Sequence, residues 1–157
     1  MGGETHLYLG KRYRLKILKG DRDNITLVRG FFLITVNGNV IFEKIKALLN
    51  EWYIHKARKK FTEAFEKQWS YFQKIMPSKP RIQIRIMRKR WGSMSKKGLL
   101  TLNTDLIRAP RECIEYVVTH ELCHLMYPDH NSGFYKMLGK VMPDWEKRKH
   151  KLELALV

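Results

Sequence analysis

Cysteine and proline are scarce in this chain of 157 residues, with two and five respectively, and no run of eighteen apolar residues occurs. Cys113 and Cys123 fall on one expected helix, where a separation of about 15 Å along the axis excludes a disulfide between them. Unpaired thiols indicate a reducing compartment. The first residues are not followed by the apolar segment of a secretory signal. We therefore expect a soluble, cytoplasmic protein without membrane contact.

Acidic side chains are also few, because 15 Asp and Glu stand against 31 Lys and Arg, which makes the formal net charge +16. Such an excess of positive charge bears on partners rather than on fold, and it favours nucleic acid, nucleotides or another polyanion. The same charge can also be a solvated surface that keeps a small enzyme in solution. Composition leaves both interpretations open.

The length and the hydrophobic content of 44% predict a single domain, residues 1–157, with one buried core. Residues 1–40 carry apolar side chains at alternate positions between turn signals such as Asn37-Gly38, which predicts a three-stranded β-meander. Residues 41–76 lack Pro and Gly and have apolar residues at helical spacing. They predict one long helix, or two with a bend, whose aromatic stripe is more typical of a buried core than of base stacking.

The segment 81–157 is the expected catalytic core. Residues 81–86 and 99–103 predict two strands that pair antiparallel as a β-hairpin. A helix should follow from Pro110, then a short helix capped by Asn131 or Ser132, and a last helix that starts at Pro143. Strands and helices in this order predict an α+β fold.

A His-Glu-x-x-His motif lies on the helix expected after Pro110. Residues four apart lie on one helical face, so His120 and His124 can offer two ring nitrogens to one metal ion. Glu121 can then act on a water molecule held by the metal, as the general base of a metallohydrolase does. Pro128 should end the helix near Tyr127 and turn the chain back, which brings His130 to the metal as third ligand.

Two alternatives accompany this metal site. A His-Glu-x-x-His sequence also arises by chance, and an amphipathic helix with exposed histidines would then be its structure. Related enzymes of the thermolysin type use a later glutamate as third ligand, which makes Glu146 and Glu153 alternatives to His130. We favour His130, because a short turn fixes its position. Zinc is the cofactor that these ligands predict.

Several short segments carry a family resemblance, namely Arg90 to Ser95, Leu102-Asn103, Pro110, Tyr116 to Leu125, His130, Phe134 and Pro143 to Trp145. Together they resemble the YgjP-like metallopeptidase family, a relative of the SprT-like and WLM zinc peptidases. The resemblance implies a zincin-like α+β fold, a zinc ion held by His120, His124 and His130, catalysis by Glu121, and peptide or protein substrates. Met94 stands where the family usually has Cys, and Tyr135 stands where Trp is common.

Two other functions remain open at this point. Some members of the family are described as nucleoside-triphosphate pyrophosphatases, and the same metal site next to basic residues would suit a triphosphate. A nucleic-acid-binding module with a structural metal is the third possibility, although such a site has no use for Glu121. Both rest on the basic segment 81–97, and the candidate nucleic-acid or phosphate contacts there are Arg85, Arg88, Lys89 and Arg90.

Overall fold

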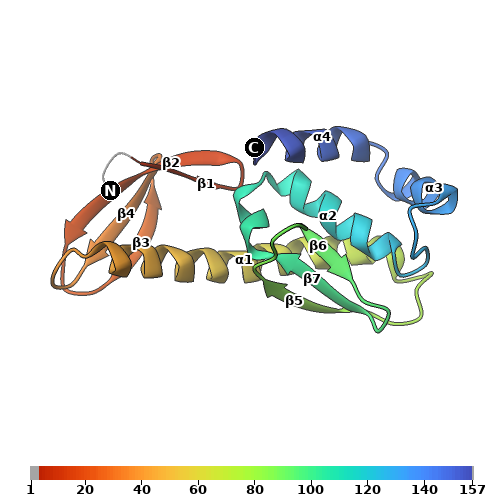
Figure 1. Ribbon diagram of the computed structural model, residues 1–157, viewed down its shortest axis with the longest axis horizontal. Coiled ribbons are helices and arrows are strands. Elements are labelled where there is room, and N and C mark those ends of the chain that lie inside the picture. The colour runs from red at the N-terminus through yellow and green to blue at the C-terminus, as the bar shows by residue number, and fades with distance from the viewer. Residues whose placement is uncertain (1–3, 157) are drawn as a thin grey trace.

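The computed structural model describes residues 4–156. Figure 1 shows an elongated molecule in which one long helix connects a sheet near the N-terminus with a second group of strands and helices. The elements in chain order are β1 (Thr5–Tyr8), β2 (Lys11–Lys19), β3 (Asn24–Val28), β4 (Phe31–Val36), α1 (Phe42–Phe72), β5 (Arg81–Arg85), β6 (Gly92–Met94), β7 (Leu99–Asn103), the 3-10 helix η1 (Thr104–Arg108), α2 (Arg111–Cys123), α3 (Ser132–Val141) and α4 (Trp145–Ala155). The α+β class is confirmed.

The N-terminal sheet has four strands in the order β1-β2-β4-β3, so the expected three-stranded meander is wrong in its pairing. β4 lies between its two neighbours, parallel to β2 and antiparallel to β3. Its inward side chains Phe32, Ile34 and Val36 are fully buried, which suits a central strand. Apolar alternation indicates which face of a strand is buried and not which strand lies beside it, so the sequence pattern could not predict this order.

α1 is one continuous helix of 31 residues, about 46 Å long. At its N-terminal half it packs against the sheet, where Trp52 meets the ring of Phe32 edge to face at 4.9 Å. Tyr53 donates a 2.6 Å hydrogen bond to the carbonyl oxygen of Leu7. At its C-terminal half Phe61 and Phe72 are fully buried. The aromatic stripe of the long helix is therefore core, as expected.

The second sheet has the order β5-β7-β6, with β5 parallel to β7 and β6 antiparallel to β7. The expected antiparallel pairing of residues 81–86 with 99–103 is wrong. The hairpin partner of β7 is the three-residue strand β6, which is too short to show alternation. A turn closed by Ser95 joins them, since its side-chain oxygen accepts from the Leu99 amide at 2.9 Å. β6 is left at one edge of this sheet.

α2 and α3 begin where the sequence predicts, whereas α4 begins at Trp145, two residues after the start expected at Pro143. Pro110 directly precedes α2, and the Asn131 side chain accepts from the Phe134 amide at 3.0 Å to cap α3. α2 ends at Cys123 and continues to Met126 as turns, slightly earlier than the end expected near Tyr127. Both cysteines are free and buried. Within residues 4–156, no helix combines the length and the apolar character that a membrane crossing needs.

Candidate metal centre

Three histidine rings converge at the C-terminal end of α2. The Nε2 atom of His130 lies 3.0 Å from that of His124 and 3.2 Å from that of His120. One ligand atom from each residue lies within 4.8 Å of the others, and in residues 4–156 no further such group of His, Cys, Asp or Glu occurs. Glu146 and Glu153 are therefore not part of the cluster. The three histidines expected from the motif are together.

The local chain path explains this convergence. His120 and His124 lie one helical turn apart, and the turn at Pro128 leads the chain back so that His130 faces them. Nδ1 of His124 lies 2.9 Å from the carbonyl oxygen of Tyr127. Because a carbonyl can only accept, this nitrogen donates, and the lone pair of the neutral ring is at Nε2. The backbone turn thus presents His124 in the tautomer that a metal ligand needs.

Phe134 on α3 supports all three imidazoles from behind. Its side chain is fully buried, and its ring centroid lies 4.6 Å from that of His124, 4.9 Å from that of His130 and 5.0 Å from that of His120. The contact restricts the rotamers of three side chains at once. Burial, reinforced by the neighbouring His124 and His130, lowers the pKa of His120 to about 4. This ring is therefore neutral and able to coordinate near pH 7.

Glu121 lies beside the histidines with only 8% of its surface exposed. Its carboxylate is 3.9 Å from Nε2 of His120. Burial raises the pKa of Glu121 to about 7, and the positive charge of Arg90 opposes that rise. A carboxyl group with this pKa can take up and release a proton near neutral pH.

Gly92 on β6 allows the sheet to approach Glu121 closely. A Cβ atom at this position would lie 3.1 Å from Val117 Cγ1 and 3.2 Å from Glu121 Cγ, tighter than ordinary van der Waals contact. Any larger residue would therefore press on the α2 face that carries the glutamate. Sequence patterns did not identify this role, because the contact joins residues from separate elements.

An open cleft of about 700 Å³ contains the histidine cluster and Glu121. The edge strand β6 and the turn after it form one wall, and the end of α2 with its following turn forms the other. The lining residues are Arg90, Gly92, Ser93, Met94, Ser95, Lys96, His120, Glu121, His124, Leu125, Pro128 and His130. This geometry offers a metal site, a proton acceptor and an exposed strand edge in one place.

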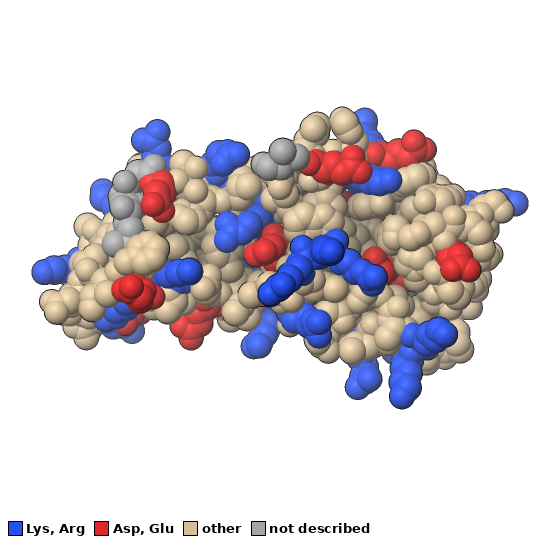
Figure 2. Space-filling view, in the orientation of Figure 1, with Lys and Arg blue, Asp and Glu red and all other residues tan. Residues whose placement is uncertain are grey.

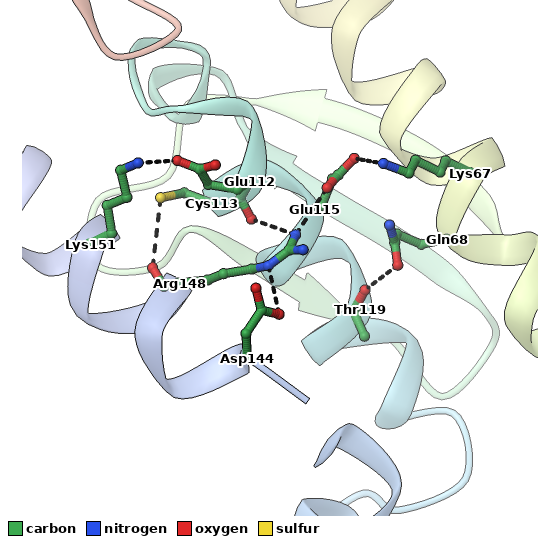
Figure 3. A network of polar contacts seen from close by, with 9 residues as sticks. All are labelled: Lys67, Gln68, Glu112, Cys113, Glu115, Thr119, Asp144, Arg148 and Lys151. Carbon is green, nitrogen blue, oxygen red and sulfur yellow. Dashed lines mark hydrogen bonds and ion pairs between the residues drawn. The ribbon is translucent and has the colours of Figure 1, made fainter. Parts of the chain in front are cut away.

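Polar contacts behind the metal centre fix α2 to the helices on either side (Figure 3). Arg148 on α4 donates to Glu115 on α2 at 2.9 Å and to Asp144 at 3.0 Å. Glu115 also accepts from Lys67 on α1 at 2.7 Å, so one carboxylate joins three helices. Lys151 adds a contact to Glu112. The motif helix is thus held by polar contacts to α1 and α4 as well as through its apolar core.

A sequence model described as the YgjP-like metallopeptidase domain matches residues 1–155. The chain belongs to the YgjP-like family. Membership makes it a zinc-dependent metallopeptidase, whose substrates are peptides or proteins. Comparison with curated proteins gives no match. The resemblance stated from the motif segments is confirmed.

Two solved metallopeptidase zymogens share the fold of about three fifths of this YgjP-like protein. Abylysin of Pyrococcus abyssi is 24% identical with a TM-score of 0.53, over 61% of this chain and 94% of abylysin. Jannalysin of Methanocaldococcus jannaschii is 19% identical with a TM-score of 0.54, over 62% of this chain and 97% of jannalysin. At these identities the likeness concerns architecture.

The four basic residues singled out from the sequence are not gathered at the metal centre of the YgjP-like chain. Arg90 lines the cleft, whereas Arg85, Arg88 and Lys89 are exposed residues outside its lining. Figure 2 shows Lys and Arg side chains spread over the whole visible face. Lys96, which belongs to the basic segment 81–97 but is not one of the four candidate contacts, does line the cleft.

Proposed function

We propose that His120, His124 and His130 hold the zinc ion of this YgjP-like metallopeptidase, and that Glu121 is its general base in peptide-bond hydrolysis. One observation carries the proposal, namely three Nε2 atoms that converge beside a buried carboxylate in a single cleft. A structural zinc site is normally closed by four protein ligands, whereas a catalytic one has three and an open position. The cluster of three favours catalysis.

The three histidines fit zinc in both number and spacing. Two donors bound to one tetrahedral zinc ion are about 3.3 Å apart when each bond is about 2.0–2.1 Å. The observed Nε2 separations of 3.0 and 3.2 Å are close to that value. When bound, zinc supplies a Lewis acid that polarises the scissile carbonyl and makes a water molecule more acidic. The residues of the chain perform the remaining steps.

Glu121 is the residue that handles the proton. Its carboxylate accepts a proton from the attacking water as the water oxygen adds to the carbonyl carbon of the peptide. The same group then gives that proton to the amine nitrogen as the carbon–nitrogen bond breaks. His124 keeps its proton on Nδ1 because this N–H donates a hydrogen bond to the carbonyl oxygen of Tyr127. Phe134 keeps the three rings oriented throughout.

Substitution with matched controls tests these roles. Glu121→Gln keeps the side-chain size but removes the base, so we expect one zinc per chain and a loss of peptide hydrolysis of at least about 100-fold. His130→Ala should lose zinc, whereas Glu146→Ala and Glu153→Ala should retain it. Elemental analysis and a peptide-mixture assay provide the readouts. Full activity of Glu121→Gln, or normal zinc content in His130→Ala, would refute the assignment.

Nucleoside-triphosphate hydrolysis is the second candidate for the same site. The positive side chains of Arg90 and Lys96 in the cleft favour an anionic substrate, and a divalent metal can also assist phosphoanhydride cleavage. A nucleotide panel assayed with zinc, manganese and magnesium separates the two reactions. Pyrophosphate release that depends on Glu121, without peptide cleavage, would favour the nucleotide reaction.

Domain organisation, cellular location and nucleic-acid binding are proposed as well. We propose that residues 1–157 act as one domain, because α1 contributes core residues to both sheets, and that the protein works in the cytoplasm, because both of its thiols are free. Non-specific nucleic-acid binding through Arg85, Arg88, Lys89 and Arg90 is proposed as an accessory property.

Limited proteolysis with mass analysis tests the single-domain proposal, because a stable fragment that ends within α1 would argue for two domains.

A further inference from the structure

Two cations flank the edge strand that forms one wall of the catalytic cleft. Arg90 lies two residues before β6, Lys96 lies two residues after it, and both line the cleft. Between them the strand presents Gly92, Ser93 and Met94. The wall against which an extended peptide would lie therefore carries positive charge at both ends.

Acidic residues are nearly absent from the same cleft. Glu121 is the sole carboxylate among its lining residues. Neither Arg90 nor Lys96 takes part in an ion pair in the described part of the chain, whereas several other lysines do, such as Lys67 and Lys79. Both cations are therefore available to a bound molecule.

The backbone that carries each cation is held in place. The Asn103 side chain donates to the carbonyl oxygens of Met87 at 2.8 Å and Arg90 at 2.9 Å, which ties the loop before β6 to the end of β7. On the other side the Ser95 carbonyl accepts from the Gly98 amide at 3.1 Å, which closes the turn that contains Lys96. The backbone on each side of the strand thus has a defined position, from which the two cationic side chains extend.

We propose that this cleft selects peptides with an acidic side chain on each side of the scissile bond, one facing Arg90 and the other facing Lys96. The inference rests on the proposed peptidase function and adds a substrate class to it. Arg90 and Lys96 are six positions apart, and six residues of extended chain cover at most about 20 Å. A peptide that lies along this wall with its scissile bond between the two cations therefore has its acidic residues within about three positions of that bond. Basic residues at these positions are rejected by like charge.

A charge-swap peptide series tests the preference. A neutral octapeptide that the zinc-loaded protein cleaves is remade with Glu, Gln or Lys at the third position on each side of the bond. An exposed charge pair changes binding by about two- to fivefold, so two such pairs should raise kcat/KM of the doubly acidic peptide over the Gln peptide by about four- to twenty-five-fold. The Lys peptide should have a lower kcat/KM than the Gln peptide. Added salt should reduce both the gain from Glu and the loss from Lys.

Variants of the two cations assign the subsites. Lys96→Gln should remove the Glu preference on one side of the bond and leave the other side unchanged, and Arg90→Gln should do the reverse. Lys97→Gln is the matched control, because Lys97 is an exposed neighbour of Lys96 that does not line the cleft. This substitution removes the same charge from the surface and should keep the wild-type ratios of kcat/KM among the Glu, Gln and Lys peptides.

A binding measurement makes the result independent of turnover. Zinc-loaded Glu121→Gln protein is titrated by fluorescence anisotropy with labelled Glu, Gln and Lys versions of the octapeptide, or of a generic Ala-Ser octapeptide if none is cleaved. Tighter binding of the Glu peptide that Lys96→Gln weakens supports the inference. Equal binding of the three peptides, or an unchanged preference in Lys96→Gln and Arg90→Gln, overturns it. Absence of cleavage of every peptide by wild type would count against the proposed function and not against this preference.

Discussion

Thr119, the residue just before the first motif histidine, donates a buried hydrogen bond of 2.9 Å to the Gln68 side chain on α1 (Figure 3). Gln68 is 3% exposed and Thr119 is fully buried. The bond joins the metal-binding helix to the longest helix of the molecule at the level of the site. It is a buried polar pair between these helices, in addition to the exposed contact of Lys67 with Glu115, and it restricts the rotation of α2 about its axis.

Breaking this pair from one side should destabilise the protein more than replacing both partners. Gln68→Leu leaves the Thr119 hydroxyl buried without an acceptor, and Thr119→Val leaves the Gln68 amide unpaired, each at a cost of about 1–3 kcal/mol. The double variant removes both polar groups and should cost less than the sum. Urea denaturation of the four proteins measures the coupling. Strict additivity would mean that the hydrogen bond does not contribute.

Gly92→Ala should impair catalysis while zinc binding stays near wild type. The added methyl group would press on Glu121 and Val117, at 3.2 and 3.1 Å, and none of the three atoms nearest to it belongs to a histidine. A displaced catalytic group can lower kcat by about ten- to hundredfold. The readouts are kcat and zinc content.

Gly139→Ala is the matched control for that substitution. Gly139 lies on α3, and the nearest atom to its added Cβ is 3.8 Å away, an ordinary contact. We expect wild-type kcat, with a small gain in stability from helix propensity. Equal kcat in both variants would show that the close approach at Gly92 has no role in placing Glu121.

The parts of this site that the sequence predicted are those controlled by local chain geometry. His120, His124 and His130 are brought together by helical spacing and one proline turn, which are short-range properties. Gly92 and Asn103 act across elements far apart in sequence, and no local pattern marks such contacts. Strand order was missed for the same reason, because both sheets place a later strand between two earlier ones. Alternation alone cannot indicate that insertion.

Zinc removal should lower thermal stability without unfolding the chain. His120 and His124 are half-buried and His130 is exposed, while the buried core is formed by other residues, so we expect the fold not to depend on the ion. Binding to the folded state alone stabilises it by RT ln(1 + [Zn]/Kd), about 4 kcal/mol at a thousandfold excess over Kd. We expect a chelator to lower Tm and added zinc to restore it. His130→Ala should lose this response, and unfolding on chelation would contradict the prediction.

The basic segment around β5 should bind nucleic acid without sequence preference. Arg85, Arg88 and Lys89 are exposed and lie outside the cleft, so they can contact phosphates without blocking the metal centre. Each phosphate neutralised on a duplex contributes about −0.9 to the slope of log K against log salt. Replacing these three residues by Gln should therefore flatten the slope by roughly two to three units. Fluorescence anisotropy with duplex and single-stranded oligonucleotides at several salt concentrations provides the measurement.

A charge-matched variant decides whether that binding is local or a property of net charge. Lys136, Lys140 and Lys147 are exposed on α3 and α4, and replacing them by Gln lowers the charge of +16 by the same three units. If the segment around β5 contacts the phosphates, this control keeps the wild-type slope. Equal flattening in both variants would instead mean diffuse attraction to a basic surface. No binding near physiological salt would leave the charge with a role in solubility alone.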